Sequence, residues 1–482
     1  MKVSLIVPGS KAAVENARYR ELFPQLLPMS VACLASVLEL NGHQVQLVDQ
    51  VPSRLTNTAL VEQLRFNSPD LIGISLLTTT VANAIEIAGL CRTRIPSAKI
   101  VAGHQHASLF PDELLSRGIV DYVVRGEGEV TLAELTAVLE AGKVPDSVAG
   151  VSYLQNGKVI HNPQRELIQD LDTLPYPAWH LVDLFNMAYM ELPVIGVYST
   201  PIAIMASRGC PYNCVFCSQD KQYKQVRLRD VNKVVDEIEY FADKFGVEWF
   251  TFNDAYFPWT KEQGMAFADQ MIRRGLHRRI RWTTESRVDR VDDELMRRLK
   301  EAGLAVIFFG FESGTQAILD RAGKQTTLEQ ARSAARATRE AGVALMGFFM
   351  LGLPGETLQT AWETVDFAIE LNCDFAKFAI TIPYPGSRLY DQVAGQVDAS
   401  QSEKFTSWTD WAGDKGELLY VPDGMTTADL LRVQRLGMLK FYARPQLVYR
   451  HLINGTLRPR DMLFGASVLL ERAGQTVWDR LR

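Results

Sequence analysis

Short apolar runs alternate with stretches of helical periodicity over residues 1–142, and this alternation limits the fold more than any other feature of the chain. The apolar runs are residues 3–9, 44–49, 70–77, 98–103 and 121–126. The helical stretches include residues 28–41, 81–94, 111–117 and 131–142. Strands that are apolar along their whole length are buried on both faces, so the pattern predicts a Rossmann-like, doubly wound parallel sheet in a domain of residues 1–145.

Ligands of doubly wound sheets bind beyond the carboxyl ends of the strands. The segments predicted to lie there are rich in Gly, Ser and Thr, and they comprise residues 8–9, 75–80, 103–108 and 126–129. No G-x-G-x-x-G sequence follows the first strand, which argues against a dinucleotide. A large ligand that needs close approach of the backbone is compatible with these loops.

A different pattern begins after residue 145. Asn156-Gly157 between alternating flanks predicts a two-residue β-hairpin, and Pro175 and Pro177 indicate a linker, so residues 146–195 are assigned to a hairpin and linker. Strand and helix then alternate again over residues 196–395. Six apolar strands there predict a partial (β/α)6 barrel of the TIM type, with its chemistry at the carboxyl ends of the strands.

Three of the six cysteines follow the first strand of this barrel in the order C-x3-C-x2-C, at Cys210, Cys214 and Cys217. An acidic chain with few cysteines and no secretory signal is expected in the reducing cytoplasm, which disfavours disulfides. Three thiolates can hold zinc or an iron-sulfur cluster. Structural zinc normally takes four ligands in two pairs, and no second C-x2-C occurs. A four-iron, four-sulfur (4Fe-4S) cluster on three cysteines leaves one iron open to a substrate or cofactor.

The cysteine motif resembles that of radical S-adenosylmethionine (SAM) enzymes. The resemblance implies that Cys210, Cys214 and Cys217 bind a 4Fe-4S cluster, that SAM chelates its open iron, and that an electron cleaves SAM to a 5'-deoxyadenosyl radical. Segments at the ends of the later strands, FNDAYF, GFESG, LGLPGET and IPYPGSRLY, match the same family. The residues that the resemblance assigns to SAM are Phe216, Asp254, Glu285, Ser286, Arg287, Glu312, Gly352 and Pro385. It places Asp254 near the methionine amino group, the residues at 285–287 and 312 near the methionine carboxylate and ribose, and Gly352 and Pro385 near the adenine. Taken singly, Glu312 or Arg287 would serve equally well as structural ion-pair partners.

A Rossmann-like domain ahead of such a barrel is similar to that of cobalamin-binding radical SAM enzymes, the class B methyltransferases and the anaerobic Mg-protoporphyrin ester cyclases. The resemblance extends over residues 1–395 and implies a cobalamin site. Its candidate contacts are Pro8, Ser75, Thr78, Gly103, His104, His106, Gly126, Glu127, Gly128 and Glu129. The chain departs from the pattern in two ways. It lacks D-x-H-x-x-G, so no histidine ligand to cobalt is named, and it has G-H-Q-H where relatives have G-G-P-H. The alternative is a degenerate domain that only supports the barrel.

Residues 396–482 are predicted to form a small, mainly helical cap, in which Trp408, Trp411 and Tyr420 either face a flat or apolar substrate or form a core. Mixed charges and a net charge of -5 argue against nucleic acid as a partner. No apolar run is long enough to predict a transmembrane segment. The expected partners are a small-molecule substrate and an electron donor such as flavodoxin or ferredoxin.

Three functions follow from these expectations. The first is cobalamin-dependent radical methylation of an unactivated carbon or a phosphorus centre, with methylcobalamin as the methyl donor. The second uses the same cofactors for oxidative cyclisation or rearrangement without net methyl transfer. The third is a non-catalytic metal-binding module, which the matches at the later strands disfavour. A methylthiotransferase is excluded, because the N-terminal domain has only Cys33 and Cys91 where that class needs three cysteines.

Overall fold

The computed structural model describes residues 1–15, 26–185, 201–218, 221–393 and 418–453 of the 482-residue chain. The chain divides into two compact units, of which the first holds the described residues up to 185 and the second holds most of those from 201 onward. No helix within the described ranges is long and apolar enough to cross a membrane.

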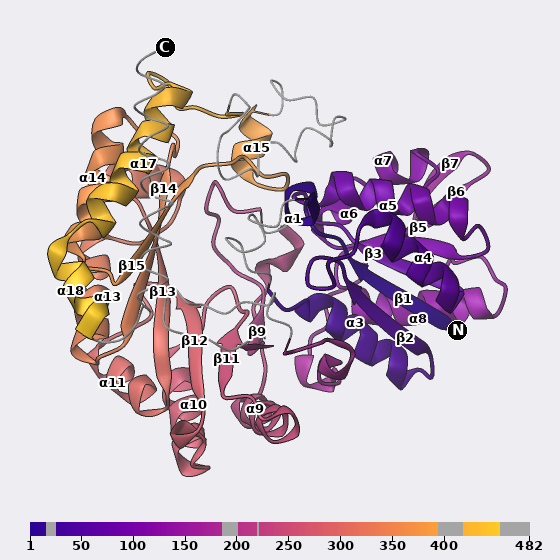
Figure 1. The fold of residues 1–482 in the computed structure, drawn as a ribbon, viewed down its shortest axis with the longest axis horizontal. Helices are drawn as coiled ribbons and strands as arrows, with labels where there is room; N and C mark the ends of the chain where they lie inside the picture. The colour runs from indigo at the N-terminus through magenta and orange to yellow at the C-terminus, as the bar shows by residue number, and fades with distance from the viewer. Residues whose placement is uncertain (16–25, 186–200, 219–220, 394–417, 454–482) are drawn as a thin grey trace. The chain divides into compact units, whose positions relative to one another are not determined.

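A seven-stranded sheet in the order β2-β1-β3-β4-β5-β6-β7 forms the centre of the first unit (Figure 1). Its first five strands are parallel: β1 (Lys2–Val7), β2 (Gln44–Asp49), β3 (Leu71–Ser75), β4 (Lys99–Gly103) and β5 (Tyr122–Val124). Each lies within the apolar run predicted for it or one residue outside. Because β1 lies between β2 and β3, the order of these five strands is that of flavodoxin-like sheets.

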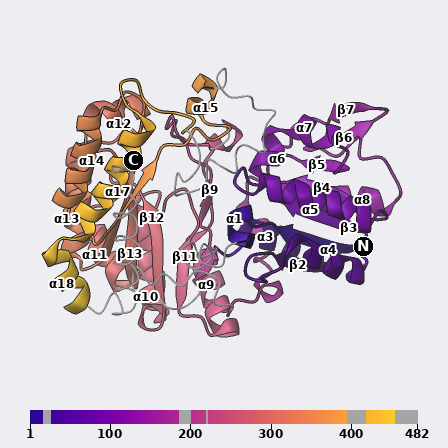
Figure 2. The same ribbon diagram turned by 45° about the horizontal axis from the view of Figure 1, so that its top comes forward.

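Helices cover both faces of this sheet. One face packs against α4 (Asn57–Asn67), α5 (Val81–Arg94), α6 (Gln105–Leu109) and α7 (Pro111–Ser116), and the other packs against α3 (Met29–Leu40) and α8 (Gly128–Glu140). Figure 2 shows the two layers from a second direction. Strand β1 supplies both cores, since Ile6 belongs to the first and Val3 and Leu5 belong to the second. The short helix α1 (Lys11–Glu15) follows β1. The prediction of a doubly wound sheet is confirmed.

The predicted hairpin extends this sheet. β6 (Val151–Gln155) and β7 (Lys158–His161) are joined by Asn156 and Gly157, whose φ angles of 51° and 75° suit a type I′ turn. β6 pairs antiparallel with β5, and Val151 lies opposite Val124. The sheet is therefore mixed, with a parallel centre and an antiparallel edge, which the apolar runs alone did not predict.

The second unit contains six parallel strands that neighbour one another in chain order, as expected of a partial barrel (Figure 1). They are β8 (Ile202–Ile204), β11 (Trp249–Phe252), β12 (Arg281–Ser286), β13 (Leu304–Glu312), β14 (Ala344–Leu351) and β15 (Phe375–Ile380). The connecting helices are α9 (Val231–Phe245), α10 (Lys261–Arg273), α11 (Asp293–Glu301), α12 (Gln316–Ala322), α13 (Leu328–Glu340) and α14 (Leu358–Glu370). Parallel strands need such crossovers, so all six end at the same edge.

Two helices from the C-terminal region complete the side of this sheet. α17 (Thr427–Tyr442) contacts α14 and the edge strand β15, and α18 (Pro445–Ile453) follows it. The hydroxyl of the half-buried Tyr442 accepts from the N–H of the buried Ala376 at 3.1 Å and donates to the Ala376 carbonyl at 2.9 Å. Gln434 Nε2 donates to the Phe378 carbonyl at 2.9 Å. These side chains satisfy backbone groups of the edge strand, which would otherwise be open to another strand.

The predicted cap over the open end of the barrel is not tested by these helices, which lie along the sheet edge. Trp408 and Trp411 lie outside the described residues. Tyr420 is half-buried and packs against an apolar cluster formed by Val215, Ile318, Ala322, Leu353 and Leu389.

Replacement of Tyr442 by Phe tests the bonds that α17 makes to the edge strand. The Tyr442→Phe change leaves the Ala376 N–H and carbonyl without their common partner in a buried position. We expect the free energy of unfolding, measured by urea denaturation, to fall by about 1–3 kcal/mol. The control is Tyr449→Phe on α18, because Tyr449 is 66% exposed. Equal stability of the two variants would contradict the assignment.

Candidate cluster and cofactor sites

The cysteine loop is closed at its base by a short antiparallel ladder between β9 (Ser207–Arg208) and β10 (Arg227–Leu228). Gly209 follows β9 with a φ of 97°, and a Cβ atom there would overlap the Gln225 carbonyl, so only glycine fits. The Cys210 N–H donates to the Tyr223 carbonyl at 2.9 Å. The first cysteine is therefore held by backbone bonds within its own loop.

The far side of the loop is tied to the barrel. The Val215 N–H donates to the Ala322 carbonyl at 2.8 Å, and the Leu389 N–H donates to the Val215 carbonyl at 2.9 Å. Val215 is buried in an apolar cluster with Leu353 and Leu389, against which Phe216 packs. Backbone and apolar contacts therefore hold the segment that separates the second and third cysteines.

All three cysteines of the motif lie on this one loop, and none of them forms a disulfide. Cys210 and Cys214 are half-buried, and Cys217 is exposed. Within the described part of the chain, no three Cys, His, Asp or Glu side chains are close enough to share one metal ion. A four-iron cluster does not need that spacing, because each cysteine binds a different iron. The donor set fits such a cluster.

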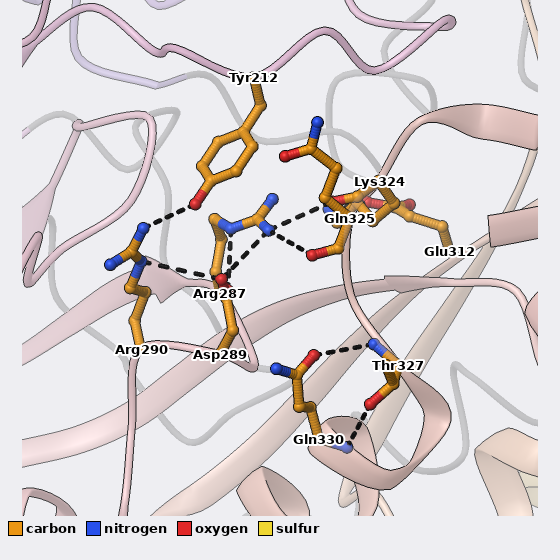
Figure 3. A network of polar contacts seen from close by, with 9 residues as sticks. All are labelled: Tyr212, Arg287, Asp289, Arg290, Glu312, Lys324, Gln325, Thr327 and Gln330. Carbon is orange, nitrogen blue, oxygen red and sulfur yellow. Dashed lines mark hydrogen bonds and ion pairs between the residues drawn. The ribbon is translucent and has the colours of Figure 1, made fainter. Parts of the chain in front are cut away.

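A buried arginine lies beside the loop (Figure 3). The Arg287 guanidinium carbon is 3.5 Å from the centroid of the Tyr212 ring. Its Nε donates to Asp289 Oδ1 at 2.9 Å, and its Nη2 donates to the Lys324 carbonyl at 3.1 Å. Arg290 Nη2 donates to the Tyr212 hydroxyl at 2.6 Å. The structure thus places Arg287, a predicted SAM contact, in a network that includes the cysteine loop.

Glu312 and Lys324 form a buried ion pair next to this network. Lys324 Nζ is 2.7 Å from Glu312 Oε1, and the two side chains are 11% and 9% exposed. Burial acts to lower the pKa of Lys324, but Glu312 and Cys214 outweigh it and the pKa is raised. Burial raises the pKa of the Cys214 thiol, and the positive charge of Lys324 opposes that rise. Glu312 has a φ of 63°, which turns the chain at the end of β13.

Glu285 and Ser286 lie at the end of β12, as predicted. Ser286 is 4% exposed, and its Oγ has no hydrogen-bond partner among the described residues. Glu285 is accessible to solvent, yet protein atoms surround it. Burial and the nearby Glu312 carboxylate therefore raise its pKa, while Lys324 and Lys377 oppose the rise. An orphaned buried hydroxyl fits a polar ligand. Successive side chains of a strand point to opposite faces, so the accessible Glu285 would make a separate polar contact.

Asp254 already has protein partners. Its carboxylate accepts from the Ala206 N–H at 3.0 Å and from the Ser207 hydroxyl. Burial raises the pKa of Asp254 to about 7, and these hydrogen bonds oppose the rise. Asp254 thus joins the end of β11 to the end of β8. Its predicted contact with the SAM amino group stays a prediction.

The segment after β14 contains a second buried polar atom without a partner. Gly352 has a φ of 87°, and its N–H donates to Glu356 Oε2. Glu356 is fully buried, and within the described structure its Oε1 lacks a hydrogen-bond partner. Burial raises the pKa of Glu356 to about 7. Pro385 lies in the loop after β15.

In the first unit the candidate residues occupy the loops after β1, β3, β4 and β5. The loop after β1 is fixed by buried amides, because Gln50 Oε1 accepts from the Gly9 N–H at 3.1 Å and Asn83 Nδ2 donates to the Gly9 carbonyl at 2.9 Å. Pro8 is buried beside them, and Ser75 is half-buried at the end of β3. Flavodoxin-like sheets bind their ligand where the strand order reverses, between β1 and β3.

The two histidines after β4 have different environments. His106 is fully buried, its Nδ1 is 3.3 Å from the Thr78 hydroxyl, and burial lowers its pKa to about 4. His104, the residue after Gly103, is partly accessible. Its own backbone has φ 80° and ψ -173°, a conformation that is almost confined to glycine. Its Nδ1 accepts from the Gln105 N–H at 2.8 Å. In a neutral ring this acceptor role leaves the proton on Nε2.

Hydrogen bonds connect the loops after β4 and β5. The Ser108 hydroxyl donates to the His104 carbonyl at 2.9 Å and accepts from the Gly126 N–H at 3.1 Å. Glu127 accepts from the Ile168 N–H at 2.8 Å. Gly128 and the buried Glu129 begin helix α8. The structure therefore brings the predicted residues of both loops to the same edge of the sheet.

Sequence analysis missed five residues of the second unit that the structure places at the site. A weak signal existed for four of them, since they follow a predicted strand or lie between the motif cysteines, whereas Lys324 follows helix α12. None could be assigned a partner without the fold. They are Tyr212, Asp289, Arg290, Lys324 and Glu356.

The raised pKa of Glu356 predicts a dependence of stability on pH. Because the folded pKa of about 7 exceeds the ordinary value of 4.5, this group stabilises the fold most below pH 4.5, and the contribution is lost as pH rises through 7. The free energy of unfolding should therefore fall by roughly 3 kcal/mol as this group ionises in the wild type, and Glu356→Gln should lack that fall. Urea denaturation of both proteins between pH 5 and 8 measures it. The control Glu329→Gln, at a side chain that is 84% exposed, should keep the wild-type slope.

The backbone of His104 predicts a stabilising substitution. His104→Gly removes a Cβ from a conformation that is unfavourable for other residues, and we expect it to stabilise the cofactor-free protein by about 1–3 kcal/mol. His104→Ala keeps the Cβ and loses the imidazole, so it should not be stabilising. Calorimetric melting of the three proteins tests this. A glycine variant less stable than the alanine variant would contradict it.

Comparisons with known proteins agree with this arrangement. Residues 204–368 match the family model of the radical SAM superfamily, and residues 20–136 match that of the B12 binding domain. An uncharacterized methyltransferase of Pyrococcus horikoshii is 30% identical over 457 residues, which cover 94% of this chain and 95% of that protein. The anaerobic magnesium-protoporphyrin IX monomethyl ester cyclase of Cereibacter sphaeroides is 30% identical over 461 residues, with 94% and 73% covered.

A solved structure has the same fold. The radical SAM methyltransferase TsrM from Kitasatospora setae, with cobalamin and a [4Fe-4S] cluster bound, has a TM-score of 0.70, 20% identity and coverage of 90% of this chain and 91% of that one. The family matches and the relatives at 30% identity agree with the cysteine motif and the two sheets. The chain therefore belongs to the radical SAM superfamily, as a cobalamin-binding member with a B12-binding domain ahead of its barrel.

Proposed function

We propose that this protein transfers a methyl group from cobalamin to an unactivated carbon or a phosphorus centre of a small molecule, by radical SAM chemistry. The observation that supports this most directly is the loop of three motif cysteines, whose Tyr212 packs on Arg287 at the end of β12, in a chain that also has a B12-binding domain. The Pyrococcus horikoshii relative, which aligns over 95% of its length, is named as a methyltransferase, and this favours methyl transfer.

The three motif cysteines would hold the 4Fe-4S cluster. When bound, the cluster supplies the electron that cleaves SAM, and cobalamin supplies the methyl group. The protein's own contribution is to place polar groups around SAM. The Ser286 hydroxyl can bond a ligand because no described protein group uses it. Glu285 is accessible for a polar contact, and Lys324 holds Glu312 in place at the end of β13.

Glu356 would act on SAM through the backbone of the LGLPGET segment. By accepting from the Gly352 N–H it fixes the turn after β14, where the resemblance places the adenine. Phe216 packs on the apolar cluster behind the cysteine loop and would help to fix the position of the last cysteine. Asp254 would position β8, from which the cysteine loop starts, whether or not it also contacts the SAM amino group.

Cobalamin would lie on the loops after β1, β3, β4 and β5 of the first unit. Its contacts there would be Pro8, Ser75, Thr78, Gly103, His104, Gly126, Glu127, Gly128 and Glu129, with the buried His106 supporting the loop through Thr78. The proton on His104 Nε2 makes this ring a hydrogen-bond donor and not a ligand to cobalt. An electron donor such as flavodoxin or ferredoxin would reduce the cluster.

Cyclisation or rearrangement without methyl transfer is a second candidate function. It is favoured by the equally similar cyclase of Cereibacter sphaeroides, which aligns with 94% of this chain. The two functions share every cofactor contact described above, so the products distinguish them.

Anaerobic reconstitution tests the proposal. The protein is supplied with iron, sulfide, hydroxocobalamin, SAM and a reductant, and bound cobalt and nucleoside products are measured. We expect one cobalamin per chain and both 5'-deoxyadenosine and S-adenosylhomocysteine. 5'-Deoxyadenosine alone would favour cyclisation or rearrangement, and a protein that binds iron but no cobalamin would overturn the proposal.

A pair of cysteine variants provides the matched control. Cys214→Ala should lose the cluster absorbance and form no 5'-deoxyadenosine, while its cobalamin content stays unchanged. Cys373→Ala removes a fully buried thiol on the outer side of the barrel, and it should keep both cofactors.

A further inference from the structure

We propose that Arg287 is a positioning residue that fixes the cysteine loop through the ring of Tyr212. This inference rests on the proposed cluster site and adds a function for two residues that are not among its three cysteine ligands. Arg287 lies at the end of β12 and is 5% exposed. Its guanidinium carbon lies 3.5 Å from the Tyr212 ring centroid, within the usual range of a cation–π contact.

The guanidinium is oriented by four hydrogen bonds (Figure 3). Nε and Nη2 donate to the Asp289 carboxylate at 2.9 and 3.4 Å, and Nη2 also reaches the carbonyls of Lys324 at 3.1 Å and Gln325 at 3.4 Å. Of the three guanidinium nitrogens of Arg287, only Nη1 makes no hydrogen bond to a described residue. The plane of the group is therefore set by the protein, and its face is presented to Tyr212.

Tyr212 is held at its edge as well as on its face. Its hydroxyl accepts from Arg290 Nη2 at 2.6 Å, and Arg290 Nε lies 3.9 Å from the Asp289 carboxylate. Asp289 thus contacts both arginines, so that one carboxylate orients the two cations that bind the ring. A lysine at position 287 would keep the charge and lose the planar face and the fork.

The position of Tyr212 in the motif explains why this contact matters. It stands two residues after Cys210 and two before Cys214, so fixing its ring restricts the segment between the first two thiols. Ordering the backbone of this segment costs conformational entropy, and the Arg287 contact offsets part of this cost before any cluster forms. A loop that is already ordered binds its cluster with less loss of entropy.

The same arginine also positions the Glu312–Lys324 pair. The carbonyls it binds belong to Lys324 and Gln325, and Gln325 has a φ of 56°, a turn conformation that the two hydrogen bonds support. The Lys324 amine then bonds Glu312 at 2.7 Å. Arg287 therefore joins the cysteine loop to the ends of β12 and β13.

Cluster retention in paired variants tests this role. Arg287→Lys, Tyr212→Leu and the double variant are reconstituted without oxygen, and the rate of iron loss to a chelator is measured. We expect each single change to speed iron loss about tenfold, because each removes the buried cation–π contact between Arg287 and Tyr212. The double change should add little more, because both single changes remove the same contact. Tyr212→Phe keeps the ring and should lose iron more slowly than Tyr212→Leu.

The matched control is Arg281→Lys at the other end of β12. Arg281 is exposed and donates only to the carbonyls of His277 and Ile280, so its variant should behave as the wild type. Circular dichroism separates a loosened loop from a protein that fails to fold. If Tyr212→Leu does not fold, iron loss from Arg287→Lys and Tyr212→Phe is sufficient to test the inference, because both variants keep most of the buried volume.

SAM titration separates positioning from direct binding. SAM changes the electron paramagnetic resonance spectrum of a reduced cluster to which it binds, so the affinity of cluster-containing molecules can be measured. Positioning predicts an affinity within about threefold of wild type for those Arg287→Lys molecules that retain a cluster. Normal iron retention with a tenfold or greater loss of SAM affinity, and no effect of Tyr212→Leu, would overturn the inference and make Nη1 a SAM contact. Failure of the wild type to take up iron would instead overturn the proposed function.

Discussion

The arrangement of parallel strands is the constraint on which the rest of this structure depends. A parallel pair needs a helix to return the chain, so all strands of such a sheet end at one edge and their following loops meet there. In the second unit this brings the cysteine loop after β8 to the same edge as Ser286, Glu312 and Gly352, which end β12, β13 and β14. In the first unit it gathers the loops after β1, β3, β4 and β5.

Much of this could be predicted from the sequence because buried parallel strands leave a strong pattern. The strands near residues 3–9 and 305–313 are largely apolar, and helix α5 has the predicted bounds of Val81–Arg94. The position of the cysteines after the first barrel strand was equally clear. The antiparallel edge made by β6 and β7 was not predicted, because alternation identifies a hairpin but not the strand with which it pairs.

The partners of the candidate residues were beyond sequence analysis for a physical reason. Motif position placed Asp254 and Arg287 at strand ends, and the structure agrees, but a strand end does not determine which neighbour a side chain will bond. Asp254 binds the β8 end through Ala206, and Arg287 binds Asp289 and backbone carbonyls. These partners are distant in sequence or belong to turns, such as that at Gln325, whose conformation no local pattern predicted.

The polar groups at the barrel edge fall into two kinds with different energetic meaning. Arg287, Asp254 and Lys324 form hydrogen bonds or ion pairs with protein groups, so much of the cost of their burial is offset and they stabilise the loops. Ser286 Oγ and Glu356 Oε1 are buried without a described partner, which costs about 1–3 kcal/mol for each. A ligand that bonds such a group recovers that free energy on binding. The edge therefore combines a rigid frame with unsatisfied groups, and this combination favours binding of a polar cofactor without large rearrangement of the protein.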